Sequence, residues 1–280
     1  MKFILYKSVL LFLFSITILN SSSKSVLEKY DFNKGSAAKL TGKLSEISGL
    51  VSTPDGKVFG HNDEKGIVYQ INYKTGEIIK EFYLTRWAPE KDFEGIAYAN
   101  KKFYMITSDG VLYEFPEGQN KTAVDYKTYN LNLGIEYNIE GLCYDSKTNS
   151  LIFVCKEFPG KTYEGNRAAY SFSLKNFKSD KSPRFLVSLK ELKDKFAIKD
   201  FYPSAIEKHP ATNSYLILSA RSGAAIVEIA EDGKLLNAKE LKPKNHKQPE
   251  GITILPNNDL LIGDEGANKN GTITLYNFIK

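Results

Sequence analysis

Three glutamates stand in the same short motif at separate places in the chain. The motif reads Asp-Phe-Glu-Gly-Ile-Ala-Tyr at 92–98, Asn-Ile-Glu-Gly-Leu-Cys-Tyr at 138–144 and Gln-Pro-Glu-Gly-Ile-Thr at 248–253. Two further copies, at 46–51 and 202–206, keep the frame but place Ser48 and Ser204 where the others carry glutamate. Carboxylates and hydroxyls are oxygen ligands of the kind that calcium prefers. They can act together only if the fold brings the copies to one place.

A second polar series follows the first at a regular distance. After each motif come a turn and an apolar run, and the run ends in a polar and usually acidic residue. The distance between paired members of the two series is 15 residues in three copies and 17 in two. The members of the second series are Asp63, Asp109, Glu157, Arg221 and Glu265. This regularity indicates a structural repeat. Arg221, its basic member, could pair with a carboxylate or receive an anionic ligand.

The stretches around both series are typical of antiparallel strands. Short runs of β-branched and aromatic residues alternate with turns rich in Gly, Asn, Asp and Pro, and the seventeen Tyr and seventeen Phe suit pleated surfaces. Five such units fit a ring. The sequence therefore predicts an all-β fold, a five-bladed β-propeller of four-stranded antiparallel blades, with a six-bladed ring as the alternative.

The fifth unit reaches the end of the chain one strand short. A propeller usually completes its last blade with a strand from the other terminus, which also removes an open sheet edge. The strand-like run 26–32 is expected to supply it. We therefore expect residues 24–280 to form a single propeller domain closed by an N-terminal strand. The longer third unit contains a polar loop at 160–167 and a short amphipathic helix at 189–196, expected to pack on the ring as a lid.

Residues 1–23 have the composition of a secretory signal peptide. A basic start is followed by an apolar run at 9–19 and a tail of small polar residues, with cleavage expected near Ser23. An uncleaved N-terminal anchor is the alternative. We therefore expect an exported protein, periplasmic, at the cell surface or secreted, which contacts a membrane only through an uncleaved leader. Cys143 and Cys155 fit this as two buried free thiols, with a disulfide as the alternative.

Composition argues against several classes of function. The net charge of +5 is modest, and the lysines are scattered among acids, so a nucleic-acid partner is not expected. The chain has no Gly-x-Ser-x-Gly elbow, no Walker loop and no His-Glu-x-x-His, so catalytic residues stay unknown. His61 and His246 lie near members of the two series and could reach a channel mouth, whereas His209 is expected in a solvated turn.

The first strand of each propeller blade lines the central channel, so the repeated motif should face the axis. Glu94, Glu140 and Glu250 would then converge, helped by Ser48 and Ser204. Two unit charges ~5 Å apart at an effective dielectric of ~20 repel by about 3 kcal/mol. Such a site must hold protons, basic side chains or a cation, and we expect calcium. The alternative is that each Glu-Gly-Ile is a turn device whose glutamate bonds amides of the neighbouring blade.

The second series is expected to surround this site at the channel mouth. The predicted ligand-binding residues there are Asp63, Asp109, Glu157, Arg221, Glu265 and His61. Two functions stay open: a calcium-binding module, expected to be a monomer, for a small-molecule, glycan or protein ligand, and a metal-dependent hydrolase of esters, lactones or phosphoesters. The sequence shows no convincing general base beside the channel, which favours binding.

The leader, the motif series and the pairs Ser108-Asp109, Lys156-Glu157 and Asp264-Glu265 together resemble the SdiA-regulated (YjiK-like) family, over roughly residues 40–280. The resemblance implies an exported β-propeller related in fold to NHL, strictosidine-synthase-like and esterase-like phytase propellers. It implies no particular reaction. Those relatives include calcium-dependent hydrolases, but their catalytic residues do not map one by one onto this sequence. The channel carboxylates therefore carry over only as a metal-site hypothesis.

Overall fold

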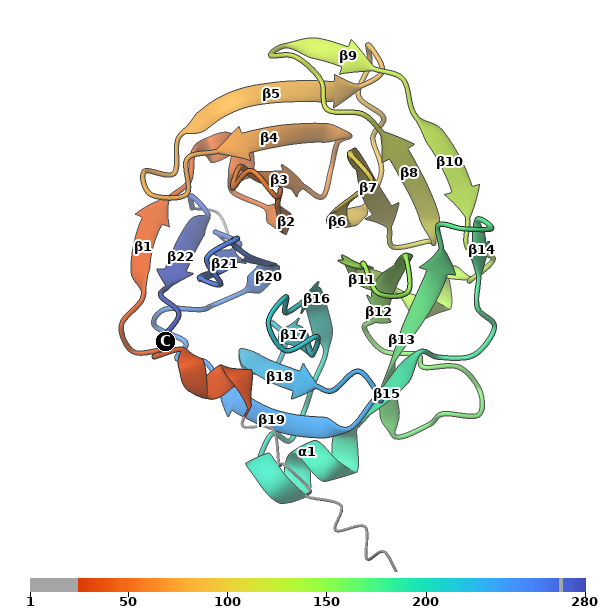
Figure 1. The fold of residues 1–280 in the computed structure, drawn as a ribbon, viewed down its shortest axis with the longest axis vertical. Helices are drawn as coiled ribbons and strands as arrows, with labels where there is room; N and C mark the ends of the chain where they lie inside the picture. Colours follow the sequence, from red (N-terminus) through yellow and green to blue (C-terminus); the bar gives the residue numbers. More distant parts are fainter. Residues whose placement is uncertain (1–24, 267–268) are drawn as a thin grey trace, which may run out of the picture.

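The computed structural model describes residues 25–266 and 269–280, so the signal peptide predicted at 1–23 lies outside the described residues. Five antiparallel sheets surround a central axis as the blades of a propeller (Figure 1). The prediction of five blades is confirmed, and the six-bladed alternative is wrong. Among the described residues, no helix is long and apolar enough to cross a membrane.

Each blade runs outward from an inner strand at the axis. The inner strands are β2 (Ile47–Ser52), β6 (Phe93–Ala99), β11 (Ile139–Asp145), β16 (Pro203–Lys208) and β20 (Pro249–Ile254). The second strands are β3 (Val58–Asn62), β7 (Lys102–Thr107), β12 (Ser150–Cys155), β17 (Tyr215–Ser219) and β21 (Leu260–Asp264). The third strands are β4 (Ile67–Ile71), β8 (Val111–Phe115), β13 (Asn166–Ser173), β18 (Ala225–Ile229) and β22 (Thr272–Tyr276). Every copy of the motif therefore opens an inner strand.

The outer strands are less regular than the inner ones. They are β5 (Ile78–Leu84), β10 (Lys127–Asn130), β14 (Lys178–Ser179) with β15 (Phe185–Ser188), β19 (Leu235–Glu240) and β1 (Ser36–Lys39). One further strand, β9 (Thr122–Val124), runs parallel to β5 and so extends blade one with a segment that precedes the outer strand of blade two. Residues 122–130 are therefore divided between the outer edges of two blades.

The last blade is closed by N-terminal residues, but not by those predicted. Residues Val26–Lys29 form a 3-10 helix, η1, in which the Ser25 hydroxyl accepts a hydrogen bond from the Leu27 amide. This capping bond favours a helical turn over a strand. The closing strand is β1, which pairs antiparallel with β22. The prediction of a strand at 26–32 is wrong, and η1 instead packs apolar side chains against blades four and five.

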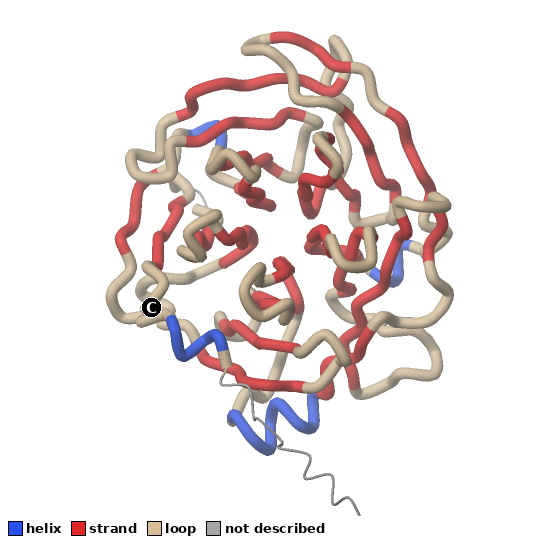
Figure 2. The backbone as a smooth tube through the Cα atoms, in the orientation of Figure 1, coloured by secondary structure: helices blue, strands red, loops and turns tan. Residues whose placement is uncertain are grey.

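The core is divided among the junctions between blades. Five clusters of buried apolar side chains fill these junctions, one between each pair of neighbouring blades. The helix α1 (Leu189–Phe196) begins and ends at the predicted residues, and its Leu192 belongs to the cluster between blades three and four. α1 lies at the rim of the ring, and Figure 2 shows that the few helical turns stay away from the central opening.

The two cysteines are buried free thiols. They lie on the adjacent strands β11 and β12, but the register places Cys143 opposite Ile152 and Cys155 opposite Ile139. The two thiols therefore do not face each other, and the disulfide alternative is wrong.

Candidate functional site

A β-bulge falls on the first-series residue in all five inner strands. The pairing of each inner strand with the second strand of its blade shifts register at this point, for example between Phe93 and Gly95 in β6. The residues passed over include Ser48, Glu94, Glu140, Ser204 and Glu250. A bulge takes one residue out of the ladder and re-aims its side chain. The sequence repeat is therefore a repeated bulge that releases one polar side chain per blade near the axis.

The glycine after each glutamate has a separate reason. A Cβ atom on Gly141 would lie 2.5 Å from the amide nitrogen of Ile206, and one on Gly95 would lie 2.7 Å from that of Leu142. The motif therefore needs glycine because neighbouring inner strands touch at this level. This contact explains the glycine of the motif, but it does not explain why a carboxylate precedes it.

The polar contacts of the ring are uneven. The Ser48 hydroxyl donates to Glu94 over 3.1 Å. Glu140 Oε1 accepts from Lys156 Nζ at 2.8 Å and from Asn138 Nδ2 at 3.1 Å. Glu140 is only 1% exposed, yet its Oε2 has no hydrogen-bond partner among the described residues. Buried polar atoms are nearly always paired, so this oxygen marks a place for a missing donor or cation.

Burial and mutual repulsion favour the neutral forms of these carboxyls. Burial raises the pKa of Glu94, and the charges of Glu140 and Asp92 raise it further. Burial also raises the pKa of Glu140, against the opposing effect of Lys156. Burial raises the pKa of Glu250 to about 8, where Lys156 again opposes it and Glu94 adds to it. Without a cation the site therefore holds protons near neutral pH.

Lys156 is a site residue that the sequence analysis overlooked. It follows β12 directly, and its Nζ forms a largely buried ion pair with Glu140. Burial acts to lower the pKa of Lys156, but Glu140 more than offsets this, and the net pKa is raised. Lys156 lies outside the repeated motif, so the repeat gives no indication of it. The available signal was its position beside Glu157 of the second series.

The ring has room for an ion but not for an organic substrate. The cavity between the inner strands has a volume of about 10 Å³, and Ser48, Glu94 and Glu250 are among its lining residues. A space of that size holds about one water molecule or ion.

The Ser204 hydroxyl donates to the Pro249 carbonyl over 2.6 Å and so links two blades.

The side chains of the ring are of the types that bind calcium, but they are not arranged as a coordination shell. It offers carboxylates, a hydroxyl and the unpartnered oxygen of Glu140, which are ligands for a hard cation. As they stand, no three His, Cys, Asp or Glu side chains among residues 25–266 and 269–280 are grouped as metal ligands.

The second series divides into an acidic and a basic side of the mouth. Asp63 and Glu265 are partly buried; burial raises the pKa of each, and the nearby charge of Glu46 adds to it. Asp109 is exposed, and so is Glu157, whose carboxylate pairs with Arg221. The acidic side is thus Asp63 and Glu265 on blades one and five, and the basic side is the guanidinium of Arg221 on blade four, which Glu157 of blade three partly neutralises.

None of the three histidines is exposed at the mouth. His61 is fully buried on β3 and packs beneath the motif, since a Cβ on Gly49 would lie 2.5 Å from its Nε2. Burial lowers its pKa to about 4. His246 is enclosed between Asp264 and Tyr276, at 2.8 and 2.6 Å. His209, expected in solvent, is buried too. The prediction of His61 at the mouth is therefore wrong, and His246 does not reach the mouth either.

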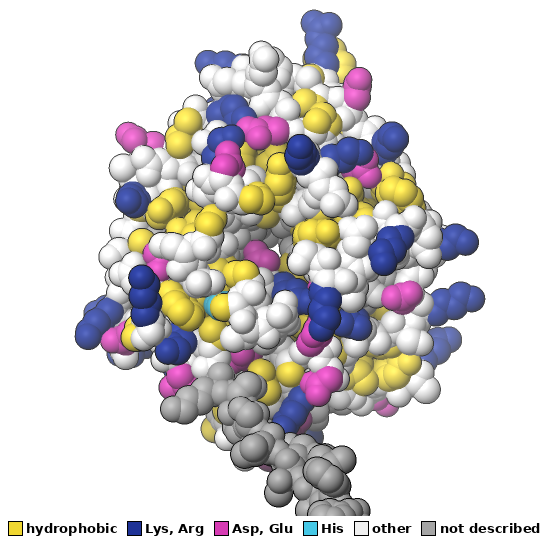
Figure 3. All heavy atoms as spheres, in the orientation of Figure 1, with side chains coloured by type: hydrophobic (Ala, Val, Ile, Leu, Met, Phe, Trp, Pro, Cys, Tyr) yellow, Lys and Arg dark blue, Asp and Glu magenta, His cyan; other side chains and the backbone are white. Residues whose placement is uncertain are grey.

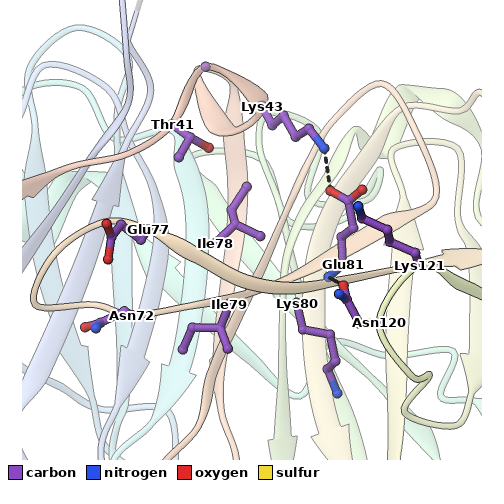
Figure 4. A pocket seen from close by; sticks show the side chains of 11 residues that line it. Thr41, Lys43, Asn72, Glu77, Ile78, Ile79, Lys80, Glu81, Asn120 and Lys121 are labelled. Carbon is purple, nitrogen blue, oxygen red and sulfur yellow. Dashed lines mark hydrogen bonds and ion pairs between the residues drawn. The ribbon is translucent and has the colours of Figure 1, made fainter.

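Two larger hollows lie away from the ring. A groove of about 880 Å³ runs along the outer strand β5, where Lys43 reaches toward Glu81 (Figure 4). A bowl of about 810 Å³ is lined by loops that join inner to second strands, with Tyr98 and Tyr144 in its wall. None of the predicted site residues lines either hollow. On the face drawn in Figure 3, acidic and basic side chains are interspersed around a central hollow, without one basic block.

Comparison with known proteins agrees with this architecture. Residues 22–269 match the family described as SdiA-regulated. No curated protein matches the sequence significantly. Among solved structures, the chain is similar to Myxococcus xanthus glutaminyl cyclase, with 14% identity, a TM-score of 0.56, and 87% of this chain and 95% of that chain covered. It is also similar to the PQQ-bound aldose sugar dehydrogenase from Streptomyces coelicolor, with 11% identity, a TM-score of 0.52, and coverage of 86% and 98%. At these identities the likeness shows the fold alone.

Proposed function

The chain belongs to the SdiA-regulated family, and we propose that its propeller binds calcium in the channel and a ligand at the surrounding mouth. The observation that carries the proposal is the charge balance of the ring. Glu94, Glu140 and Glu250 lie close enough to shift one another's pKa, and Lys156 forms an ion pair with Glu140 and acts on the other two through its charge. Fully ionised, the group keeps two uncompensated negative charges, which one divalent cation or two protons would neutralise.

Calcium suits the site better than a smaller divalent ion does. Its coordination is irregular and accepts carboxylate, hydroxyl and water oxygens together, whereas magnesium demands a near-ideal octahedron. The unpartnered Oε2 of Glu140 would gain a partner in the ion. Because the cavity is so small, the ligand would lie above the ion, against the second series.

Calorimetry can separate the ion from the competing protons. Calcium binding at pH 7 should release protons from Glu94, Glu140 and Glu250, so the measured heat should depend on the ionisation enthalpy of the buffer. Metal analysis of protein purified without chelator should find calcium. Glu250→Gln should weaken binding, whereas Glu240→Gln, an exposed change on β19, should not. Absence of both metal and calcium heat would refute the proposal.

Hydrolysis is the second candidate, and one observation favours it. Burial raises the pKa of Glu140 beside Lys156, and a carboxyl whose pKa lies nearer neutral can give and take protons at physiological pH. Ester, lactone and phosphoester substrates should be screened with calcium present. Turnover that is lost in Glu140→Gln but kept in Glu207→Gln would support an enzyme. No turnover with any substrate would leave the binding module.

We also propose export and a monomeric state. The basic and apolar composition of residues 1–23 supports a leader. Fractionation should find the protein outside the cytoplasm, and recovery in the cytoplasm with an intact N-terminus would contradict export. Light scattering of the mature protein should give the mass of one chain. The ligand would be a small molecule, glycan or protein rather than a nucleic acid.

A further inference from the structure

We infer that the basic side of the mouth is an anion subsite, formed by Arg167, Tyr202 and Arg221, which takes a carboxylate or phosphate group of the ligand. The inference rests on the proposed function only for the position of that ligand at the mouth. It assigns a chemical class to the ligand, an acid or a phosphorylated compound.

Two guanidinium groups meet at one aromatic ring. The guanidinium carbons of Arg167 and Arg221 each lie 4.8 Å from the centroid of the Tyr202 ring. The whole chain contains four arginines among its 38 basic residues, so half of them gather at this tyrosine. Arginine, unlike lysine, offers a flat fork of donors that matches a carboxylate or phosphate.

The protein fixes one arginine and leaves the other accessible. Arg167 donates from Nε to the Phe201 carbonyl at 2.7 Å and from Nη1 to the Glu157 carbonyl at 3.0 Å. Burial lowers the pKa of Arg167, and the like charge of Arg221 adds to this effect. The Arg221 side chain is 58% exposed. The hydrogen bonds of the two arginines within the described residues run from Nε and Nη1, and none involves Nη2, so these donors stay available to a ligand.

The side chain of Glu157 already shows which chemistry this site accepts. Its carboxylate pairs with Arg221 Nη1, and both side chains are more than half exposed. An exposed ion pair of this kind contributes little to stability. A ligand carboxylate or phosphate could therefore replace Glu157 at the guanidinium at small cost.

The subsite adjoins the channel. Tyr202 precedes Ser204 by two residues, a separation of about 7 Å along an extended chain. Glu157 follows Lys156, whose Nζ contacts Glu140 in the ring. An acid held by the arginines would thus extend toward the ring. The carboxylates of Asp63 and Glu265, on the acidic side of the mouth, would repel the anionic group and so fix the ligand's direction.

Opposite charge changes provide a direct test. Succinate and inorganic phosphate, as separate probes, should be titrated into calcium-free protein at constant ionic strength and followed by calorimetry. Wild type should bind at least one of them saturably. Arg221→Gln should weaken that binding about tenfold or more. Glu157→Gln, which removes the internal competitor, should tighten it. Arg167→Lys, which keeps the charge but loses the fork, should also weaken it, and the exposed Arg86→Gln should behave as wild type.

The outcomes test the anion subsite and the calcium site independently. Binding of neither probe, or equal affinity in Arg221→Gln and wild type, would overturn the anion subsite. So would an equal loss in Arg86→Gln, which would indicate general charge attraction. Arg221→Gln should keep the full calcium-induced rise in melting temperature, which shows that it folds. A missing calcium response with intact arginine-dependent anion binding would sink the calcium proposal and leave the subsite standing.

Discussion

Glu140 is buried and Glu207 is half-buried, on neighbouring inner strands, and desolvation raises the pKa of both, that of Glu207 to about 7. They differ in how their oxygens are used. Glu207 accepts from the Lys208 amide at 2.8 Å and from the Thr253 hydroxyl at 3.1 Å, one bond to each oxygen. Glu140 takes two donors on Oε1 and has none for Oε2 among the described residues. A raised pKa alone thus does not distinguish a binding site from a satisfied structural carboxyl.

The difference follows from position along the strand. Glu207 lies three residues beyond Ser204 on β16, and the equivalent residues of blades one to three are Val51, Ala97 and Cys143. Glu207 is therefore one carboxyl in a mostly apolar layer and needs one set of hydrogen bonds. Glu140 lies at the level of the bulges, where other blades also supply carboxyls.

The largest expected effect concerns Lys156, which forms an ion pair with Glu140 in the ring. Lys156→Met should lower the free energy of unfolding by about 3 kcal/mol at pH 8 without calcium, because it leaves a buried carboxylate unpaired. Urea denaturation measures the change, and calcium should restore part of the loss. Thr253→Val, which removes the donor to Glu207, should cost about 1 kcal/mol, and calcium should stabilise this variant and wild type equally, so the difference between them should remain. Equal losses of stability in Lys156→Met and Thr253→Val would contradict the difference between Glu140 and Glu207.

Calcium should separate the two glutamates by melting temperature. At a hundredfold excess over Kd, a ligand of the folded state adds about 2.7 kcal/mol, which in a protein of this size raises Tm by about 5–10 °C. Glu140→Gln and Glu250→Gln should lose most of this rise. Glu207→Gln should keep it. If calcium raised the Tm of Glu140→Gln as much as that of wild type, the ring would not be the calcium site.

The dependence of stability on pH sharpens the comparison further. The unfolded carboxyls titrate near 4.5, whereas the folded pKa is about 7 for Glu207 and about 8 for Glu250. These carboxyls bind more protons in the folded state than in the unfolded state, so their contribution to calcium-free stability should fall as pH rises from about 4.5 to about 8. His61 and His209, whose folded pKa is about 4, act in the opposite direction below about pH 6.5. We expect a fall of more than about 1 kcal/mol in denaturation series. Calcium should reduce the slope that the ring causes, but not the part due to Glu207. A flat profile in wild type would contradict these shifts.

Ser48→Ala should produce the smallest effect. The hydroxyl donates one bond to Glu94, so its loss should cost about 1 kcal/mol or less at a pH where Glu94 is ionised. Calcium titration should show slightly weaker binding. If Ser204→Ala weakened calcium binding as much, the assignment of Ser204 to a bond between blades would fail.

Most of the fold could be predicted from the sequence repeat, because the five copies support the same assignment of strands. The closing strand had no such support. Residues 26–32 have a strand-like composition, but the Ser25 cap makes their first part helical, while Ser36–Lys39 has small and polar side chains without a strand pattern. The division of residues 122–130 between two blades was equally hidden, because only tertiary contacts decide which sheet edge β9 joins.

The first-series residues of the candidate site could also be identified from the repeat, whereas residues outside the repeat could not. Periodicity gave the ring residues, since equivalent positions lie at equivalent distances from the axis. Lys156 occurs in blade three alone, so no repeat pointed to it. His61 was misplaced because its spacing from Asp63 does not reveal burial: Asp63 lies beyond the end of β3, whereas His61 lies within that strand and packs under Gly49.

The pairing of β1 with β22 has a consequence for how the protein is made. Ser36 lies opposite Leu275, so its partner is synthesised more than two hundred residues after it. Until then the fifth blade lacks a partner for its edge, and the early blades can form while the ring stays open. The ring therefore cannot close before β22 has been made, and a chain truncated shortly before Thr272 would lose β22 and leave β1 without its partner.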